Sequence, residues 1–326
     1  MSKTYLITGI TGFAGPHLAN LLVKRGHTVH GMVRSSNGRE EDIRDVVPDK
    51  NMAQIKFVYG DLTSRESMMK LFKEEKYDGV FHLAAQSHPP TSFIDPVGTF
   101  NANANGTINL VTALIEHSPT TKLMLCSTSE VYGRVPGETK ETQPMNPINP
   151  YGVSKAAADL YVRERAVSEG FPFFVTRAFS HTGPRRGKKF SISSDAFQIA
   201  RIVKGLQEPK IQVGKLESKR VVMDVRDCDE AYIALMEGDF KSGEAYNVGG
   251  DTVYSMGELL DMMLELRGLK GKVELIRDEK LVRKIGFGIQ IPDSTKLRQL
   301  TGWKPKIPIK QTLQDLLSYW EAKVSE

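Results

Sequence analysis

The stretch TYLITGITGFAG, residues 4–15, decides the fold. Its apolar first part predicts a buried strand, and a helical pattern of leucines follows its last glycine. Between this strand and this helix lie three glycines, Gly9, Gly12 and Gly15. Glycines at such a turn permit a tight bend and let backbone N–H groups approach a pyrophosphate at the amino end of the helix. The stretch therefore predicts a dinucleotide-binding unit of strand, glycine turn and helix.

Strand and helix patterns alternate through the amino-terminal half. Apolar runs predict further strands at 27–33, 55–59, 79–85, 123–126 and 173–177, and helices at 64–75 and 107–116. Connections of this length allow crossovers between parallel strands. We therefore predict an α/β fold of the Rossmann type, a doubly wound parallel sheet with helices on both faces, accompanied by a smaller α/β domain.

The composition is that of an ordinary globular protein. Of 326 residues, 40% are hydrophobic and 25% are charged, and the net charge of +5 is spread along the chain rather than gathered into a basic face. No apolar stretch is long enough to span a bilayer or to act as a signal peptide. Cys126 and Cys228 lack metal-ligand spacing, so we expect reduced thiols and no metal. We expect a soluble, cytoplasmic protein without a nucleic-acid or membrane partner.

The end of the second strand bears on the choice of cofactor. NAD-preferring sites place a carboxylate there, whereas this chain has Arg34 and Ser35, which suit a 2′-phosphate. We therefore favour NADP as the cofactor, with NAD as the alternative. The competing interpretation of Arg34 is that its side chain is only solvated. The residues expected to contact the cofactor lie in the glycine turn, at strand ends and on a helix after residue 150: Gly9, Thr11, Gly12, Phe13, Gly15, Arg34, Ser35, Asp61, Leu62, Leu83, Ala84, Ala85, Tyr151 and Lys155.

A polar cluster and a tyrosine–lysine pair follow the strand at 123–126. The cluster contains Thr128 and Glu130, and Tyr151 and Lys155 stand four residues apart, on one face of an expected helix. A lysine charge near the phenol favours its ionised form, which can exchange a proton with a substrate hydroxyl. The alternative is that Tyr151 and Lys155 are ordinary residues of a helix surface. The polar cluster at the preceding strand end makes this alternative weaker.

As a set, these motifs resemble the extended short-chain dehydrogenase/reductase family. The resemblance rests on TGxxGxxG at 8–15, Thr128 and YxxxK at 151–155, and it covers nearly the whole chain. Within the family, LAAQSHPPTSF, STSEVYG and GPRRGKKF are similar to segments of GDP-mannose 4,6-dehydratases. GFAG, SHTGP, DVRD and STKLRQLTGWKP are similar to segments of GDP-4-keto-6-deoxymannose reductases.

The resemblance implies a 4,6-dehydratase acting on GDP-mannose or a related GDP-hexose or GDP-heptose. C4 is oxidised, water is eliminated across C5–C6, and the hydride returns to C6. Tyr151 is then the base for the 4-hydroxyl, with Lys155 lowering its pKa, Thr128 hydrogen-bonds the same oxygen, and Glu130 takes the C5 proton. The alternatives are a GDP-4-keto-6-deoxy-sugar reductase, a nucleotide-sugar 4-epimerase or 4-dehydrogenase, and a non-catalytic dinucleotide-sensing scaffold.

The resemblance also implies that the second half closes over a nucleotide-diphosphate sugar. Residues 1–176 are interpreted as the NADP-binding domain, with segments around 225–255 returning to it, and 177–326 as mainly the substrate domain. Arg220 and Arg283 are expected at the diphosphate. Arg185 and Arg186 are left between assisting there, binding the cofactor phosphate at a subunit interface, and lying in a solvated loop. The expected substrate contacts are Ser87, His88, Thr128, Ser129, Ser180, Arg185, Val213, Lys215, Arg220 and Arg283.

Departures from the family pattern gather on this substrate side. Ser180 replaces the asparagine of FNH, and Lys215 replaces the asparagine of GN. This chain has Arg-Val-Val from Arg220 where the family pattern has RDF or RDW. It has Arg-Lys-Ile-Gly from Arg283 where the family pattern has RPxE. The reaction class therefore follows more closely from the resemblance than the sugar or the base does. A homodimer or homotetramer, paired through helices of the cofactor domain, is expected by resemblance alone.

Overall fold

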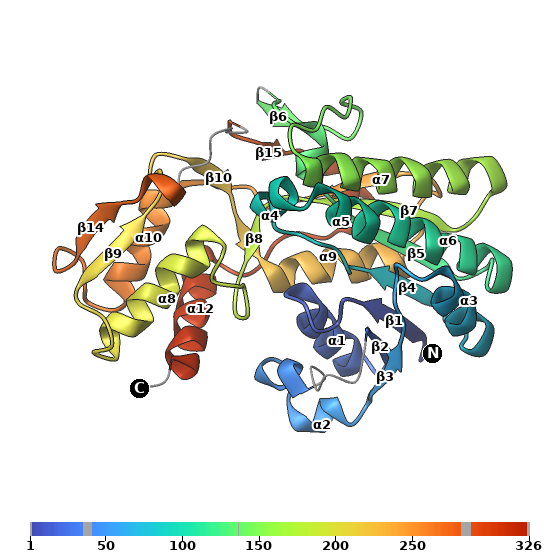
Figure 1. Cartoon of the computed structure of the whole chain (residues 1–326), viewed down its shortest axis with the longest axis horizontal. Coiled ribbons are helices and arrows are strands. Elements are labelled where there is room, and N and C mark those ends of the chain that lie inside the picture. Colours follow the sequence, from blue (N-terminus) through green and yellow to red (C-terminus); the bar gives the residue numbers. More distant parts are fainter. Residues whose placement is uncertain (1, 35–40, 136, 282–287, 325–326) are drawn as a thin grey trace.

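The computed structural model describes residues 2–34, 41–135, 137–281 and 288–324, and its centre is a parallel sheet of seven strands (Figure 1). The strand order is β12-β7-β5-β4-β1-β2-β3, and each neighbouring pair runs parallel. The chain winds outward from β1 in both directions, which confirms the predicted Rossmann-like fold. The strands are β1 Thr4–Thr8, β2 Thr28–Val33, β3 Ile55–Tyr59, β4 Gly79–His82, β5 Lys122–Thr128, β7 Phe173–Ala178 and β12 Ala245–Val248.

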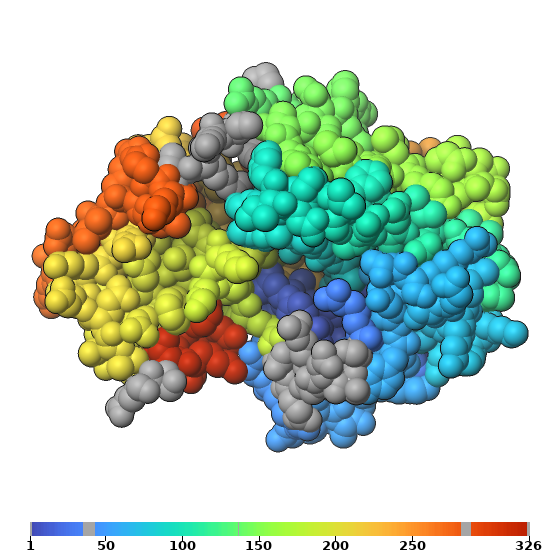
Figure 2. Space-filling model, viewed as in Figure 1, coloured from blue at the N-terminus to red at the C-terminus, as the bar shows by residue number. Residues whose placement is uncertain are grey.

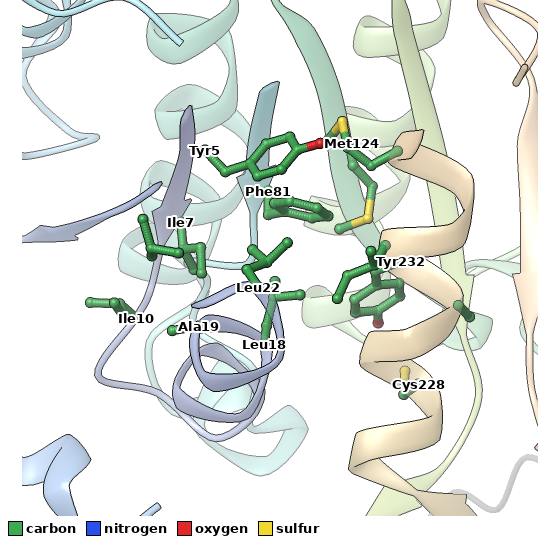
Figure 3. Packing of buried hydrophobic residues seen from close by; sticks show 14 of the residues in the cluster. Tyr5, Ile7, Ile10, Leu18, Ala19, Leu22, Phe81, Met124, Cys228 and Tyr232 are labelled. Atoms are coloured by element: carbon green, nitrogen blue, oxygen red, sulfur yellow. The ribbon is translucent and has the colours of Figure 1, made fainter. Parts of the chain in front are cut away.

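Alternate strand residues point into two separate cores. Tyr5 and Ile7 belong to one core and Leu6 to the other, as the period of a strand requires. Figure 3 shows the first core, where Tyr232 lies near Leu18 across from the strands. Because both faces are covered, the strands are continuous apolar runs in the sequence. The first face carries α1 Ala14–Lys24, α9 Val225–Glu237, α2 Asp49–Met52 and α11 Thr295–Thr301, and the second carries α3 Arg65–Glu74, α6 Gly106–His117 and α7 Pro150–Glu169.

A second group of elements has a core of its own and forms the left part of Figure 1. Its helices pack on one another, and β9 pairs in parallel with β14. We call this group the small lobe and the sheet with its helices the main lobe. The small lobe contains α8 Ser191–Val203, β9 Lys210–Val213, β10 Lys219–Val221, β13 Val253–Ser255, α10 Met256–Leu266, β14 Glu274–Arg277 and α12 Ile309–Lys323.

The chain passes between the lobes several times. It leaves the sheet after β7, returns through α9 and β12, and ends on the small lobe with α12. No helix in the described part of the chain is both long and apolar enough to cross a membrane. The remaining elements are α4 Pro89–Ile94, α5 Pro96–Phe100, the π-helical turn η2 Asn101–Asn105, β6 Glu138–Thr139, β8 His181–Thr182, β11 Met223–Asp224, β15 Ile291–Pro292, and the 3-10 turns η1 Glu41–Asp45, η3 Ser129–Tyr132 and η4 Glu279–Leu281.

Candidate functional site

The glycine turn after β1 packs closely against the chain that follows β4. Gly9 has a φ of +77°, and a Cβ there would lie 2.8 Å from the Ala84 backbone nitrogen. A Cβ on Gly15 would lie 2.5 Å from the Gly9 carbonyl oxygen, so neither position accepts a side chain. The amino end of α1 has no side-chain cap. Its first N–H groups are therefore available to an anionic ligand.

A buried chain of hydrogen bonds fixes the strand ends beside this turn. His82 Nδ1 lies 2.7 Å from Thr8 Oγ1, and His82 Nε2 lies 3.0 Å from Thr107 Oγ1. The Ala84 backbone N–H donates to Thr8 Oγ1 at 3.2 Å. Burial lowers the pKa of His82 to about 3, so the imidazole is neutral at physiological pH. His82 therefore connects β4 to the end of β1 and to α6.

The residues expected around the adenosine end lie at the ends of adjacent strands. Arg34 is exposed directly after β2, and Gly60 N donates to Val33 O across to β3. Asp61 accepts hydrogen bonds from the backbone and hydroxyl of Thr63, at 2.9 and 2.8 Å. Leu62 is buried. Ser35 lies outside the described residues.

Thr128, Glu130 and Tyr151 are brought together at the end of β5. The Thr128 side chain lies close enough to the phenol of Tyr151 to lower its pKa. Asn149 caps α7 by accepting from Gly152 N at 2.7 Å, and its amide donates to Glu130 Oε2 at 2.7 Å. One residue therefore orients both the carboxylate and the first turn of the helix that carries Tyr151. No motif in the sequence predicts this bridge between Asn149 and Glu130.

We expected Lys155 to be the group that lowers the pKa of Tyr151. In the structure, other groups act on this pKa. Burial raises the pKa of Tyr151 well above its usual range, and the Glu130 carboxylate raises it further. The Thr128 side chain and the Arg186 charge lower the same pKa in part. Lys155 is itself buried, and burial lowers its pKa. None of the described residues gives Lys155 Nζ a hydrogen-bond acceptor, so its donors remain available for a ligand.

Arg186 is the cation whose charge lowers the pKa of Tyr151. Its guanidinium lies between two aromatic rings, 4.7 Å from the centroid of Phe13 and 3.5 Å from that of Phe190. His181 stacks on Phe13 at 5.7 Å. Burial lowers the pKa of Arg186 to about 10, which leaves the group charged at neutral pH. Among the described residues, no carboxylate or hydrogen-bond acceptor pairs with its side chain. Figure 2 shows the surface hollowed between the lobes, with amino-terminal residues on its floor.

Arg185 points in another direction. Its guanidinium donates to backbone carbonyls of Thr11 and Gly12 in the glycine turn and pairs with Asp45. The resemblance leaves Arg185 at the substrate, at a cofactor phosphate or in solvent. In the structure its side chain hydrogen-bonds the glycine turn, and its backbone is left-handed, with a φ of 74°.

The other expected substrate residues are divided between the lobes. His88 Nδ1 lies 2.8 Å from Thr91 Oγ1, and its ring meets Phe190 edge-on at 5.5 Å. Ser129 Oγ donates to Gln290 Oε1 at 2.9 Å, a partner 161 residues away that the sequence did not indicate. Ser87 is exposed in the main lobe, and Ser180 is exposed just after β7, where the chain leaves the sheet. The small lobe holds Val213, which is buried, and Lys215, which is exposed. It also holds Arg220, whose Nη1 donates to Gly288 O at 3.3 Å. Arg283 lies outside the described residues.

The chain is similar to known proteins over nearly its whole length. The family model described as GDP-mannose 4,6 dehydratase matches residues 6–316. A Pseudomonas aeruginosa protein named GDP-6-deoxy-D-mannose reductase is 32% identical over the full length of both chains. A Vibrio cholerae protein named GDP-mannose 4,6-dehydratase is 31% identical, covering 97% of this chain and 93% of that protein. The solved structure of RMD from Pseudomonas aeruginosa, complexed with NADPH, aligns with a TM-score of 0.84 and 30% identity over 99% of this chain and 100% of that one.

Proposed function

The chain belongs to the GDP-mannose 4,6 dehydratase family, and on that premise we propose that it is an NADP-dependent 4,6-dehydratase of a GDP-sugar. The observation that carries the proposal is the place of Glu130. Its carboxylate is held by Asn149 beside the Thr128–Tyr151 pair. Oxidation or reduction at one carbon needs a single proton-transfer group, whereas elimination across the neighbouring bond needs a second.

In the proposed reaction, each residue acts on a different proton. Tyr151 accepts the proton of the 4-hydroxyl, and Thr128 hydrogen-bonds the same oxygen. The new ketone acidifies the C5 proton, which Glu130 removes and passes to the departing 6-hydroxyl, so that this oxygen leaves as water. Tyr151 releases the proton of the 4-hydroxyl to solvent, and Glu130 takes up a proton from solvent. Glu130 then returns a proton to C5. The nicotinamide supplies the reversible hydride acceptor that C4 oxidation and C6 reduction require.

The burial of Tyr151 and the nearness of the Glu130 carboxylate have a consequence for this sequence of steps. A carboxylate close to the phenol keeps the tyrosine protonated until a cation or the cofactor compensates. We assign that compensation to Lys155, whose buried ammonium has donors to spare, and to Arg186. The two cations approach the reacting end of the site from α7 and from the loop after β8.

NADP is proposed as the cofactor on two grounds. Arg34 is exposed at the end of β2, where a guanidinium can reach a 2′-phosphate and no carboxylate occupies the same position. The aligned structure from Pseudomonas aeruginosa is described as complexed with NADPH. The residues proposed to hold the pyrophosphate are those of the glycine turn, because their backbone approaches too closely for side chains.

A guanosine diphosphate sugar is proposed as the substrate because the related proteins are named for GDP-linked sugars. Arg220, on β10 at the edge of the small lobe, is the described cation proposed for the diphosphate. Ser180 and Lys215 stand where the family pattern has amides. We therefore propose that the sugar differs from mannose in the groups that those amides would contact.

The reductase of a GDP-4-keto-6-deoxy sugar is the second candidate, because a relative of that name aligns over the full length of the chain. The two activities are separated by incubating the protein with a panel of GDP-, UDP- and dTDP-sugars that includes a GDP-4-keto-6-deoxy sugar, with and without NADPH, and measuring the masses of the products. A dehydratase yields a product that has lost water and consumes no NADPH. Loss of NADPH in proportion to a product that gains two hydrogens would establish the reductase and refute the dehydratase.

We also propose a homodimer formed through α4, α5 and α7. These helices pack on one another and expose apolar side chains that a monomer leaves in water. Ile94 and Val97 are 85% and 70% exposed, and Leu160 and Val167 are 55% and 73% exposed. The division near residue 176 is retained as a proposal too, supported by the separate core of the small lobe.

A further inference from the structure

Arg185 has a backbone conformation that is costly for its residue type. Its φ of 74° lies in the left-handed region, and no other non-glycine residue in the described part of the chain has a positive φ. Such a conformation persists only where surrounding contacts hold it, and it clusters at functional sites. The side chain of Arg185 reaches the glycine turn.

The guanidinium uses all three of its nitrogens on the main lobe. Nε donates to Gly12 O at 2.7 Å, Nη2 donates to Thr11 O at 2.9 Å, and Nη1 donates to Asp45 Oδ1 at 2.6 Å. The side chains of Arg185 and Asp45 are only 11% and 9% exposed. A planar fork with fixed donor directions satisfies such a set, whereas a lysine ammonium at the same position does not.

These contacts orient the peptide groups that would face a pyrophosphate. In a trans peptide the C=O and N–H point in opposite directions. Binding of the Gly12 carbonyl by Arg185 therefore directs the N–H of Phe13 to the other side, at the uncapped amino end of α1. That N–H belongs to the set that binds phosphate oxygens at such a helix end.

Asp45 connects this arrangement to the carboxyl-terminal helix. Its Oδ2 accepts from Tyr319 OH at 3.1 Å and lies 3.6 Å from Lys323 Nζ, and both residues belong to α12. A parallel connection joins His17 Nε2 of α1 to Pro184 O at 3.0 Å. The glycine turn, the loop after β8 and the last helix of the small lobe therefore share one network.

We propose that Arg185 is a positioning residue for the dinucleotide, and that Asp45 and α12 set its position, so that cofactor affinity depends on the contacts of Asp45 with Tyr319 and Lys323 of α12. The proposal rests on the proposed function only in taking the glycine turn as the dinucleotide site. Arg185 acts through the backbone of the turn and needs no contact with substrate. It gives the small lobe, which holds the proposed diphosphate contact Arg220, a route to the cofactor.

The test is NADPH binding to the full-length protein, followed by NADPH fluorescence, together with thermal unfolding of each variant. Arg185→Lys is expected to weaken NADPH binding about tenfold or more, because a charge-assisted bidentate contact to the turn is lost. Asp45→Asn and Tyr319→Phe, which keep Arg185, are expected to weaken it by about two- to tenfold. They keep the proposal testable if Arg185→Lys does not fold.

The matched control is Asp315→Asn. Asp315 is also on α12 and also pairs across the lobes, with Arg226 Nη2 at 2.7 Å, but that arginine contacts Asp224 and not the glycine turn. Its NADPH affinity is expected to stay within about twofold of the unaltered protein. Equal weakening in Asp315→Asn, or full NADPH affinity in Arg185→Lys, would overturn the proposal.

The outcomes also separate this proposal from the proposed function. If the unaltered protein binds NADPH but converts no GDP-sugar, the dehydratase proposal fails and the comparison of variants still decides the role of Arg185. If the unaltered protein binds neither NADPH nor NADH, both proposals are refuted.

Discussion

A buried ion pair holds α7, the helix that carries Tyr151 and Lys155, against the central sheet. Arg177 on β7 donates from Nε to Asp159 Oδ2 at 2.9 Å and from Nη2 to Asp159 Oδ1 at 3.1 Å. The side chains are 1% and 0% exposed. Arg177 Nη1 also donates to Tyr132 OH at 2.9 Å and to Glu141 O at 3.1 Å. The pair thus joins three segments around the proposed site.

Asp159→Asn removes the charge while keeping the shape of the side chain. Breaking a buried pair by removing one partner leaves the other charge uncompensated and costs about 3–5 kcal/mol. Total stabilities are about 5–15 kcal/mol, so the substitution is expected to remove a large fraction of the stability of the main lobe. The control is Glu169→Gln on the same helix, whose exposed i,i+4 pair with Arg165 contributes about 0.5 kcal/mol or less.

Urea unfolding of the two variants, followed by circular dichroism, measures the difference directly. Asp159→Asn is expected to lower the midpoint clearly without a change in m, and Glu169→Gln is expected to leave it nearly unchanged. The reasoning would be refuted if the two variants lost equal stability, or if Asp159→Asn lost less than about 1 kcal/mol.

Two further predictions concern the site and the assembly. Arg186→Gln removes a cation that lowers the pKa of Tyr151, so the pKa of Tyr151 is expected to rise. The ascending limb of the kcat–pH profile requires the ionised phenol and therefore moves to higher pH. An unmoved limb would show that Arg186 does not act on Tyr151. Leu160→Asp places a charge among the exposed apolar side chains of α7 and is expected to convert the dimer to a monomer in light scattering. Glu164→Gln on the same helix is the control, and a dimer in both variants would contradict the proposed interface.

The sequence predicted the central sheet well because its strands are buried on both faces. The strands expected at 55–59 and 173–177 agree with β3 and β7 to within one residue. The strand expected at 79–85 ends instead at His82, because the next residues turn to pack on the glycine turn, with Ala84 N bound to Thr8 Oγ1. Local apolarity predicts a strand, but a tertiary contact decides where it ends.

The site was predictable where a motif supplies several residues in order. Thr128, Glu130 and Tyr151 could be placed together because a strand end precedes a helix that returns to it. Gln290, which binds Ser129 from a distant part of the chain, carried no local signal. Arg185 was expected at a phosphate because guanidinium groups suit phosphate, and its direction depends on a left-handed φ that the sequence around it does not determine.

The most direct test of the dehydratase proposal compares the unaltered protein with Glu130→Gln in deuterium oxide, using the GDP-sugar that the panel identifies and no added reductant. Product mass is measured for both. The unaltered protein is expected to release a product that has lost water and carries one solvent deuterium at C5, because Glu130 exchanges its proton with solvent. Glu130→Gln is expected to bind the cofactor normally and to lose water at least about a hundredfold more slowly. Undiminished water loss in Glu130→Gln, or a product formed only at the expense of added NADPH, would contradict the account.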